Sequence, residues 1–212
     1  MRPVTFSRTL AAAAVGAVCA SQTVGIAGNP LLINGTLASN GVAQLGAQQI
    51  IGITSVGDIH TVVFTVTGTD DQGRVISETI TNVNTNTVNS VLNYRTVTSI
   101  ISSGVIASAV TVDTIGVGGS TPIPLDIYLR SGHTVSVNVT GTINYTVQVT
   151  NDDPFNTSAS TPLNWITDPA IAAGQTTSQN GATANAYRAV RLLTNSGTGT
   201  GTITVTQQGL IV

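Results

Sequence analysis

The sequence contains no lysine and one cysteine, and only 8% of its 212 residues are charged. All seven basic residues are arginines, and nine acidic residues give a formal net charge of −2. A chain without a basic stripe cannot neutralise a run of phosphates, so the composition excludes nucleic acid as an expected partner. The single Cys19 excludes an intrachain disulfide, and no neighbouring base or cation in the sequence would activate its thiol.

Groups for catalysis are equally scarce. The two histidines, His60 and His133, have no cysteine, histidine or carboxylate near them at metal-ligand spacing. Glu78 is the only glutamate, and the sequence contains no phosphate-binding loop, nucleophile elbow or pair of catalytic carboxylates. We therefore expect a protein that is not an enzyme and that uses neither a cofactor nor a metal.

Threonine, valine, serine, asparagine and glycine take the place of the missing charges. Short runs rich in β-branched residues recur about every ten residues, bounded by glycine and asparagine, which predicts β-strands. Residues 70–73, Asp-Asp-Gln-Gly, predict a hairpin turn between two such runs. Without a convincing amphipathic helix, the pattern indicates an all-β protein with a sandwich or barrel-like fold.

The chain also resembles itself internally. Residues 94–101 are echoed by residues 187–193, and further echoes follow downstream at the same offset of 93. Upstream, Val-Thr-Gly-Thr at residues 66–69 recurs at residues 139–142, an offset of 73, which also relates the two histidines. The echoes predict two related β modules in tandem.

Composition predicts the boundaries between these modules. A Gly-rich stretch followed by two prolines separates the two sets of strands, as an interdomain linker does. A long polar loop in the second module contains the only tryptophan, and loops of this length often carry function. The expected parts are an N-terminal arm at residues 1–29, a first module at 30–118, a linker at 119–124, and a second module at 125–212 with an insertion at about 155–183.

The N-terminal segment has two interpretations. Arginines precede an apolar run at residues 9–20, a run too short to span a bilayer, so we expect no membrane insertion. We favour an extended arm that docks on a neighbouring subunit; the alternative is a secretory signal peptide. The candidate interaction residues are Leu10, Val15 and Val18 in the arm and Trp165 in the insertion.

Several segments resemble structural proteins of tailed bacteriophages. A strand ending in Thr-Gly-Thr-Asp at residues 67–70 turns through Gly-Arg into Ser-Glu-Thr at residues 77–79, and residues 95–100 match the strand that follows in such proteins. Residues 123–126 and 139–155 are similar to their second halves. The resemblance covers residues 31–212; it implies a virion protein and carries over no catalytic residue.

The resemblance and the neutral composition together favour a capsid decoration, or cement, protein at the virion surface. Its expected partners are the major capsid protein or other virion proteins, and further copies of itself, with a trimer as one arrangement. One alternative is a tail, collar or head-fibre component of the virion. The other is a secreted bacterial β-sandwich adhesin or carbohydrate-binding module that uses Trp165, which would go with the signal-peptide interpretation.

Overall fold

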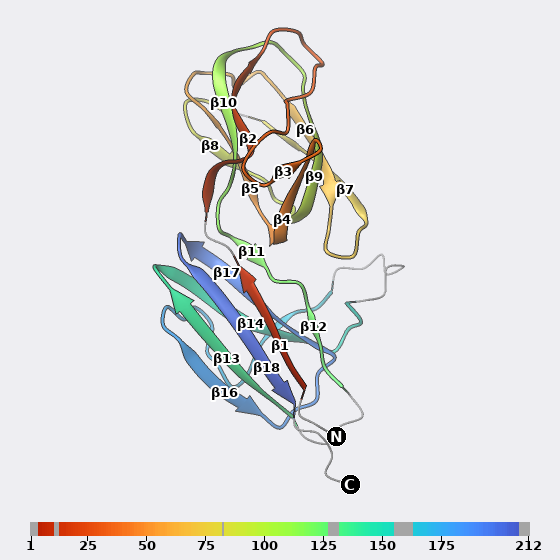
Figure 1. The fold of residues 1–212 in the computed structure, drawn as a ribbon, viewed down its shortest axis with the longest axis vertical. Coiled ribbons are helices and arrows are strands. Elements are labelled where there is room, and N and C mark those ends of the chain that lie inside the picture. The colour runs from red at the N-terminus through yellow and green to blue at the C-terminus, as the bar shows by residue number, and fades with distance from the viewer. Residues whose placement is uncertain (1–3, 11–12, 82, 127–131, 155–162, 208–212) are drawn as a thin grey trace. The chain divides into compact units, whose positions relative to one another are not determined.

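The computed structural model describes residues 4–10, 13–81, 83–126, 132–154 and 163–207. In these residues there is no helix, and every regular element is a β-strand. These residues form several antiparallel sheets, none of which closes into a barrel, and contain no helix that could cross a membrane. The chain divides into two compact units (Figure 1). The first unit is Ala12–Val117, and the second unit combines Met1–Ala11 with Gly118–Val212.

The first unit contains two sheets. One sheet has the order β2-β10-β5-β8, and the other has the order β3-β4-β9-β6-β7. The strands of the first sheet are β2 (Ala14–Val24), β10 (Ile106–Thr114), β5 (Ile51–Ser55) and β8 (Thr87–Asn89). Those of the second are β3 (Ala38–Ser39), β4 (Val42–Gln49), β9 (Tyr94–Ser102), β6 (Phe64–Thr69) and β7 (Val75–Ile80).

The second unit also contains two sheets. One has the order β1-β18-β13-β16; in the other, β17 pairs with β14, β11 and β12, and β15 pairs with β14. The strands of the first are β1 (Val4–Leu10), β18 (Thr200–Gln207), β13 (His133–Thr140) and β16 (Gln179–Thr183). Those of the second are β11 (Gly118–Gly119), β12 (Ile123–Pro124), β14 (Ile143–Thr150), β15 (Ile166–Thr167) and β17 (Ala189–Gly197).

The sheet orders of the two units agree strand by strand. If β4 and the β11–β12 pair count as the second strand of their units, one sheet in each unit joins the first, eighth, third and sixth strands. The other sheet joins the second, seventh, fourth and fifth strands, with β3 as a short addition at an edge of the first unit. Two four-stranded sheets with this connectivity have the topology of a jelly roll, which is built from two Greek keys.

The chain order of the units differs from the expected tandem order. The first strand of the second unit, β1, precedes the whole of the first unit. In the sequence, the first unit is therefore inserted between two parts of the second. Figure 1 shows β1 beside β18, although they come from opposite ends of the chain. Residues expected to form an arm at 1–29 instead contain β1 and β2, which lie in different units because their hydrogen-bond partners, β18 and β10, do.

The first unit has a single apolar core between its two sheets. Alternate residues of β6, such as Phe64 and Val66, are buried in one apolar cluster with Tyr94 and Ile100 of β9 and with Val112 of β10 from the opposite sheet. The period-2 pattern of the sequence produces this arrangement, since successive side chains in a strand point to opposite faces. Each such side chain contributes about 1.5–3 kcal/mol when it is withdrawn from water.

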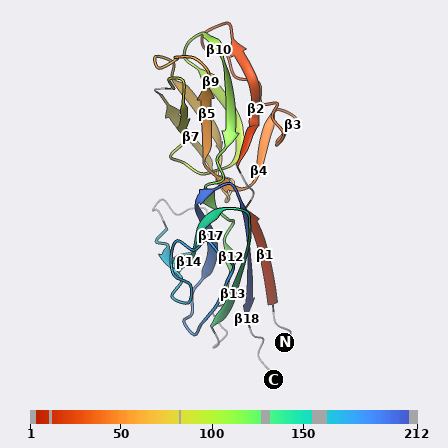
Figure 2. The same ribbon diagram turned by 90° about the vertical axis from the view of Figure 1, so that its left-hand side faces the viewer.

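The second unit packs its two sheets in the same way. Ile203 and Val205 of β18 are buried, as is Leu192 of β17 in the opposite sheet. A Cβ atom added to Gly201 would lie 3.0 Å from Leu192 Cδ2 and 3.3 Å from Ile143 Cδ1, so the sheets approach closely at this glycine. Figure 2, a side view, separates β1 and β18 from β14 of the other layer.

The topology supports one of the internal echoes and corrects the other. The offset of 93 places β9 on β17 and β10 on β18, which occupy equivalent places in their sheets. The offset of 73 places β6 on β13, whereas the equivalent of β6 is β14. Short strands of alternating threonine and valine resemble one another whatever their place in a sheet, so this echo, and the relation of His60 to His133, does not follow the fold.

Gly68 provides a test of the packing inside the first unit. It lies where the β6–β9 register shifts, and a Cβ atom there would collide with the carbonyl oxygen of Thr96 and approach Tyr94 Cδ1 to 2.8 Å. We expect Gly68→Ala to lower the free energy of unfolding by about 1–3 kcal/mol, measured by urea denaturation, because the backbone must move. Gly25→Ala, with no atom near its Cβ position, should change it by less than about 0.5 kcal/mol. Equal effects would contradict this packing.

Candidate functional site

The predicted interaction residues of the N-terminal segment do not lie together. Leu10 is 2% exposed at the end of β1 in the second unit, and Val18 is 0% exposed in β2 in the core of the first unit. Both side chains are therefore core residues of their own sheets. Only Val15, at 83% exposed, is available to another molecule.

Trp165, the other predicted interaction residue, is partly exposed in the second unit. It precedes β15, and the Cζ atom of Arg191 on β17 lies 4.2 Å from the centroid of its ring. The Arg191 Nε donates a hydrogen bond of 2.9 Å to Gln148 Oε1 on β14, its cross-strand neighbour. The three side chains form a platform on the β15-β14-β17 sheet. Within it, the Arg191 guanidinium lies over the indole ring in a cation–π contact.

A buried pair that the sequence did not reveal joins His133 to Asp168. His133 begins β13 and Asp168 follows β15; the imidazole Nε2 lies 3.0 Å from the carboxylate Oδ2. The other carboxylate oxygen accepts a hydrogen bond from the Ala170 backbone N–H, and the Tyr187 ring packs edge-on against the imidazole. The pair connects the turn after β15 to β13. Because both side chains are buried, a substrate cannot reach them.

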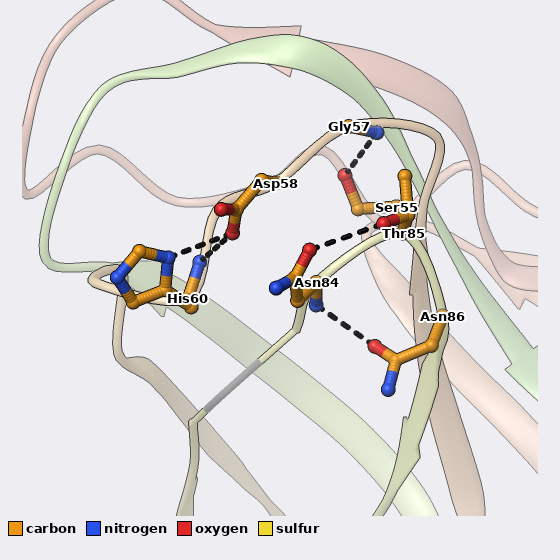
Figure 3. Close-up of polar contacts among 7 residues, drawn as sticks. All are labelled: Ser55, Gly57, Asp58, His60, Asn84, Thr85 and Asn86. Carbon is orange, nitrogen blue, oxygen red and sulfur yellow. Dashed lines mark hydrogen bonds and ion pairs between the residues drawn. The ribbon is translucent and has the colours of Figure 1, made fainter.

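A second histidine–carboxylate pair is exposed, in the loop between β5 and β6 (Figure 3). Asp58 Oδ1 accepts a hydrogen bond of 3.0 Å from the His60 backbone N–H and lies 2.8 Å from the imidazole Nδ1. These bonds, the backbone one first, lower the pKa of Asp58 below its ordinary value of 3.8. The pair leaves the imidazole at the surface with a carboxylate on one side.

The loop that carries this exposed pair is held by the segment before β8. Asp58 forms an isolated β-bridge with Asn84, and the Asn84 backbone N–H donates to Asn86 Oδ1 at 2.8 Å. Thr85 between them has a φ of 50°, a left-handed conformation that a threonine adopts only when its surroundings fix it. Figure 3 shows the two segments side by side, so the pair belongs to a well-braced turn.

Cys19 has no role as a nucleophile. It is buried in the core of the first unit, where desolvation, and next the negative charge of Asp113, raises the pKa of its thiol to about 12. A thiolate is the reactive form, so the native side chain is inert near neutral pH. Within the described residues, no three His, Cys, Asp or Glu side chains gather into a group that could hold a metal ion.

Two of the accessible features within the described residues are the Trp165 platform and the Asp58–His60 turn. Both offer binding chemistry, through an aromatic ring beside a cation and through a polar loop. Comparison with protein-family models finds no family that matches the chain, and comparison with curated proteins finds no match.

The exposed pair makes a titration prediction. Asp58 should titrate below 3.8, because the charged form accepts two hydrogen bonds, and the stability it contributes is present above its unfolded pKa and lost as the pH falls through the folded pKa. In His60→Ala the backbone bond remains, so the Asp58 pKa should rise only part of the way, as followed by NMR of the carboxyl carbon. A full return to the ordinary value would show that the imidazole, not the backbone, holds it low.

The buried pair makes a stability prediction. Asp168→Ala leaves His133 and the Ala170 N–H without their partner, so the free energy of unfolding should fall by about 2–4 kcal/mol in urea denaturation. Asp58→Ala, at the exposed pair, is the matched control and should shift the midpoint far less. Equal shifts for the two variants would overturn the structural role of the His133–Asp168 pair.

Proposed function

We propose that the chain is a non-enzymatic structural protein of a bacteriophage virion. In the most specific form of the proposal, it decorates the outer shell of the capsid and stabilises contacts between major capsid subunits. The observation that carries it is the presence of two jelly-roll topologies in one small chain of very low charge. Jelly rolls are frequent in viral capsid proteins, although they also occur in lectins and cupins, so the fold supports the role by analogy.

The surface chemistry supports a role in assembly. Few charges repel neighbouring molecules, and threonine- and asparagine-rich sheets offer many weak polar contacts. On a repeating shell such contacts gain strength because many copies bind at once. Self-association, for instance as trimers at local three-fold positions, would add to this effect. The segments that resemble tailed-phage proteins include β6, β7 and β9, which are neighbours in one sheet of the first unit.

Trp165 supports a second candidate, a secreted adhesin or carbohydrate-binding module. A partly exposed tryptophan on the face of a sheet is the kind of side chain on which a sugar ring stacks. Against it, Arg191 lies over the indole ring and would compete with such a ligand. Trp165→Ala should abolish any glycan binding that the full chain shows on an array.

The number of copies per particle tests the proposal. In virions purified from cells that carry the gene, mass spectrometry should find the chain at a copy number comparable with that of the major capsid protein. Attachment should persist at 1 M salt, where the Debye length falls to about 3 Å, because few charges take part. A small copy number set by tail or collar symmetry would move the protein to that part of the virion. Absence from purified particles, or glycan binding lost in Trp165→Ala, would overturn the virion role.

A further inference from the structure

The second unit does not contain its own first strand. In the first unit all eight positions of the sandwich come from one continuous stretch, from β2 to β10. In the second unit the continuous stretch from Gly118 onward supplies the second to eighth positions only. The first position is filled by β1, which precedes the entire first unit in the sequence.

The β1–β18 ladder is regular. Seven consecutive pairs, from Val4 opposite Gln207 to Leu10 opposite Gly201, form without a register shift. The equivalent ladder in the first unit, between β10 and β2, has three irregularities. A regular antiparallel ladder is made of main-chain hydrogen bonds, so an identical segment from any copy of the chain would form the same bonds.

The edge of β18 needs a partner. Ile203 and Val205 are buried, and Leu10 of β1 is buried beside Gly201. Without β1 the edge of β18 would present a row of unpaired N–H and C=O groups next to an apolar core, a surface that recruits another strand. The second unit therefore needs one strand of defined length and register at this edge, and β1 fills that place in the structure.

The covalent connection of β1 leads to the other unit. β1 ends at Leu10 and β2 begins at Ala14, so three residues join the strand to the first unit. A short connection favours exchange between copies, because the same contacts form without the constraint that it imposes. We propose that β1 is a donor strand: β1 of one copy pairs with β18 of a second copy and links the two chains. The inference rests on the topology and does not require the virion role.

Disulfide trapping tests the exchange in the full chain. Ser7 and Thr204 are register partners, and the Cα separation of such a pair, about 4.5–5.5 Å, suits a disulfide. Chains with Ser7→Cys alone and isotope-labelled chains with Thr204→Cys alone are unfolded together in urea, refolded at high concentration and oxidised with copper phenanthroline. A covalent heterodimer, identified by mass, is the expected result. Cys19 is buried and stays unreactive, which the unsubstituted chain verifies.

Two controls define the outcome. Thr200→Cys replaces Thr204→Cys at a position four residues away on β18, ~13 Å along the strand, and should give roughly tenfold less heterodimer because no disulfide spans that distance. The double variant Ser7→Cys/Thr204→Cys reports closure within one chain as a monomer. Heterodimer at or below the level of the Thr200→Cys control overturns the proposal, whatever the double variant shows.

A linker variant gives a second, independent measurement. A Gly-Ser insertion in residues 11–13 relaxes the connection, so β1 should pair more readily with β18 of its own chain, and the heterodimer yield should fall severalfold. A yield that does not change would contradict the role of the short connection and with it the proposed exchange. Failure of either measurement leaves the copy number per virion, and hence the proposed function, untouched.

Discussion

The antiparallel ladder between β1 and β18 joins the two ends of the chain, and the second unit depends on it. The ladder adds β1 as the first strand of a sandwich whose other strands begin at Gly118. In the sequence, Ala12–Val117 therefore stands between two parts of one unit. The nesting follows from this one pairing, since every other ladder joins strands within a continuous stretch of its unit. The main-chain hydrogen bonds of this ladder thus join a strand that precedes the first unit to the sheet of the second unit.

The low charge of the chain bears on the structural role proposed for it. The buried His133 imidazole lies 3.0 Å from the Asp168 carboxylate, and only 8% of all residues are charged. Such a surface has little long-range steering and little repulsion, and it favours contacts made at short range between many copies. These properties agree with the structural role proposed above, in which strand exchange would add a directional bond to the non-specific contacts.

Local patterns in the sequence predicted the strands well and their partners poorly. Alternation identified β6 and β7, and the turn at residues 70–73 forms as predicted, with Gly73 at a φ of 79° and Asp70 accepting from the Arg74 backbone N–H. The apolar run that contains Leu10 and Val18 looked continuous, yet its two halves enter different sheets. Pairing across most of the chain leaves no local signal, and neither does a contact such as that between His133 and Asp168, because the fold alone brings these residues together.

The long separation of β1 from its partner β18 along the chain has a consequence for synthesis. A ribosome adds about 5–20 residues per second, so on the order of ten seconds or more pass between the emergence of β1 and that of β18. The first unit can fold during that interval, while the strand already made has no edge of its own chain to join. β1 therefore stays without its partner strand until the strands of the second unit have been made.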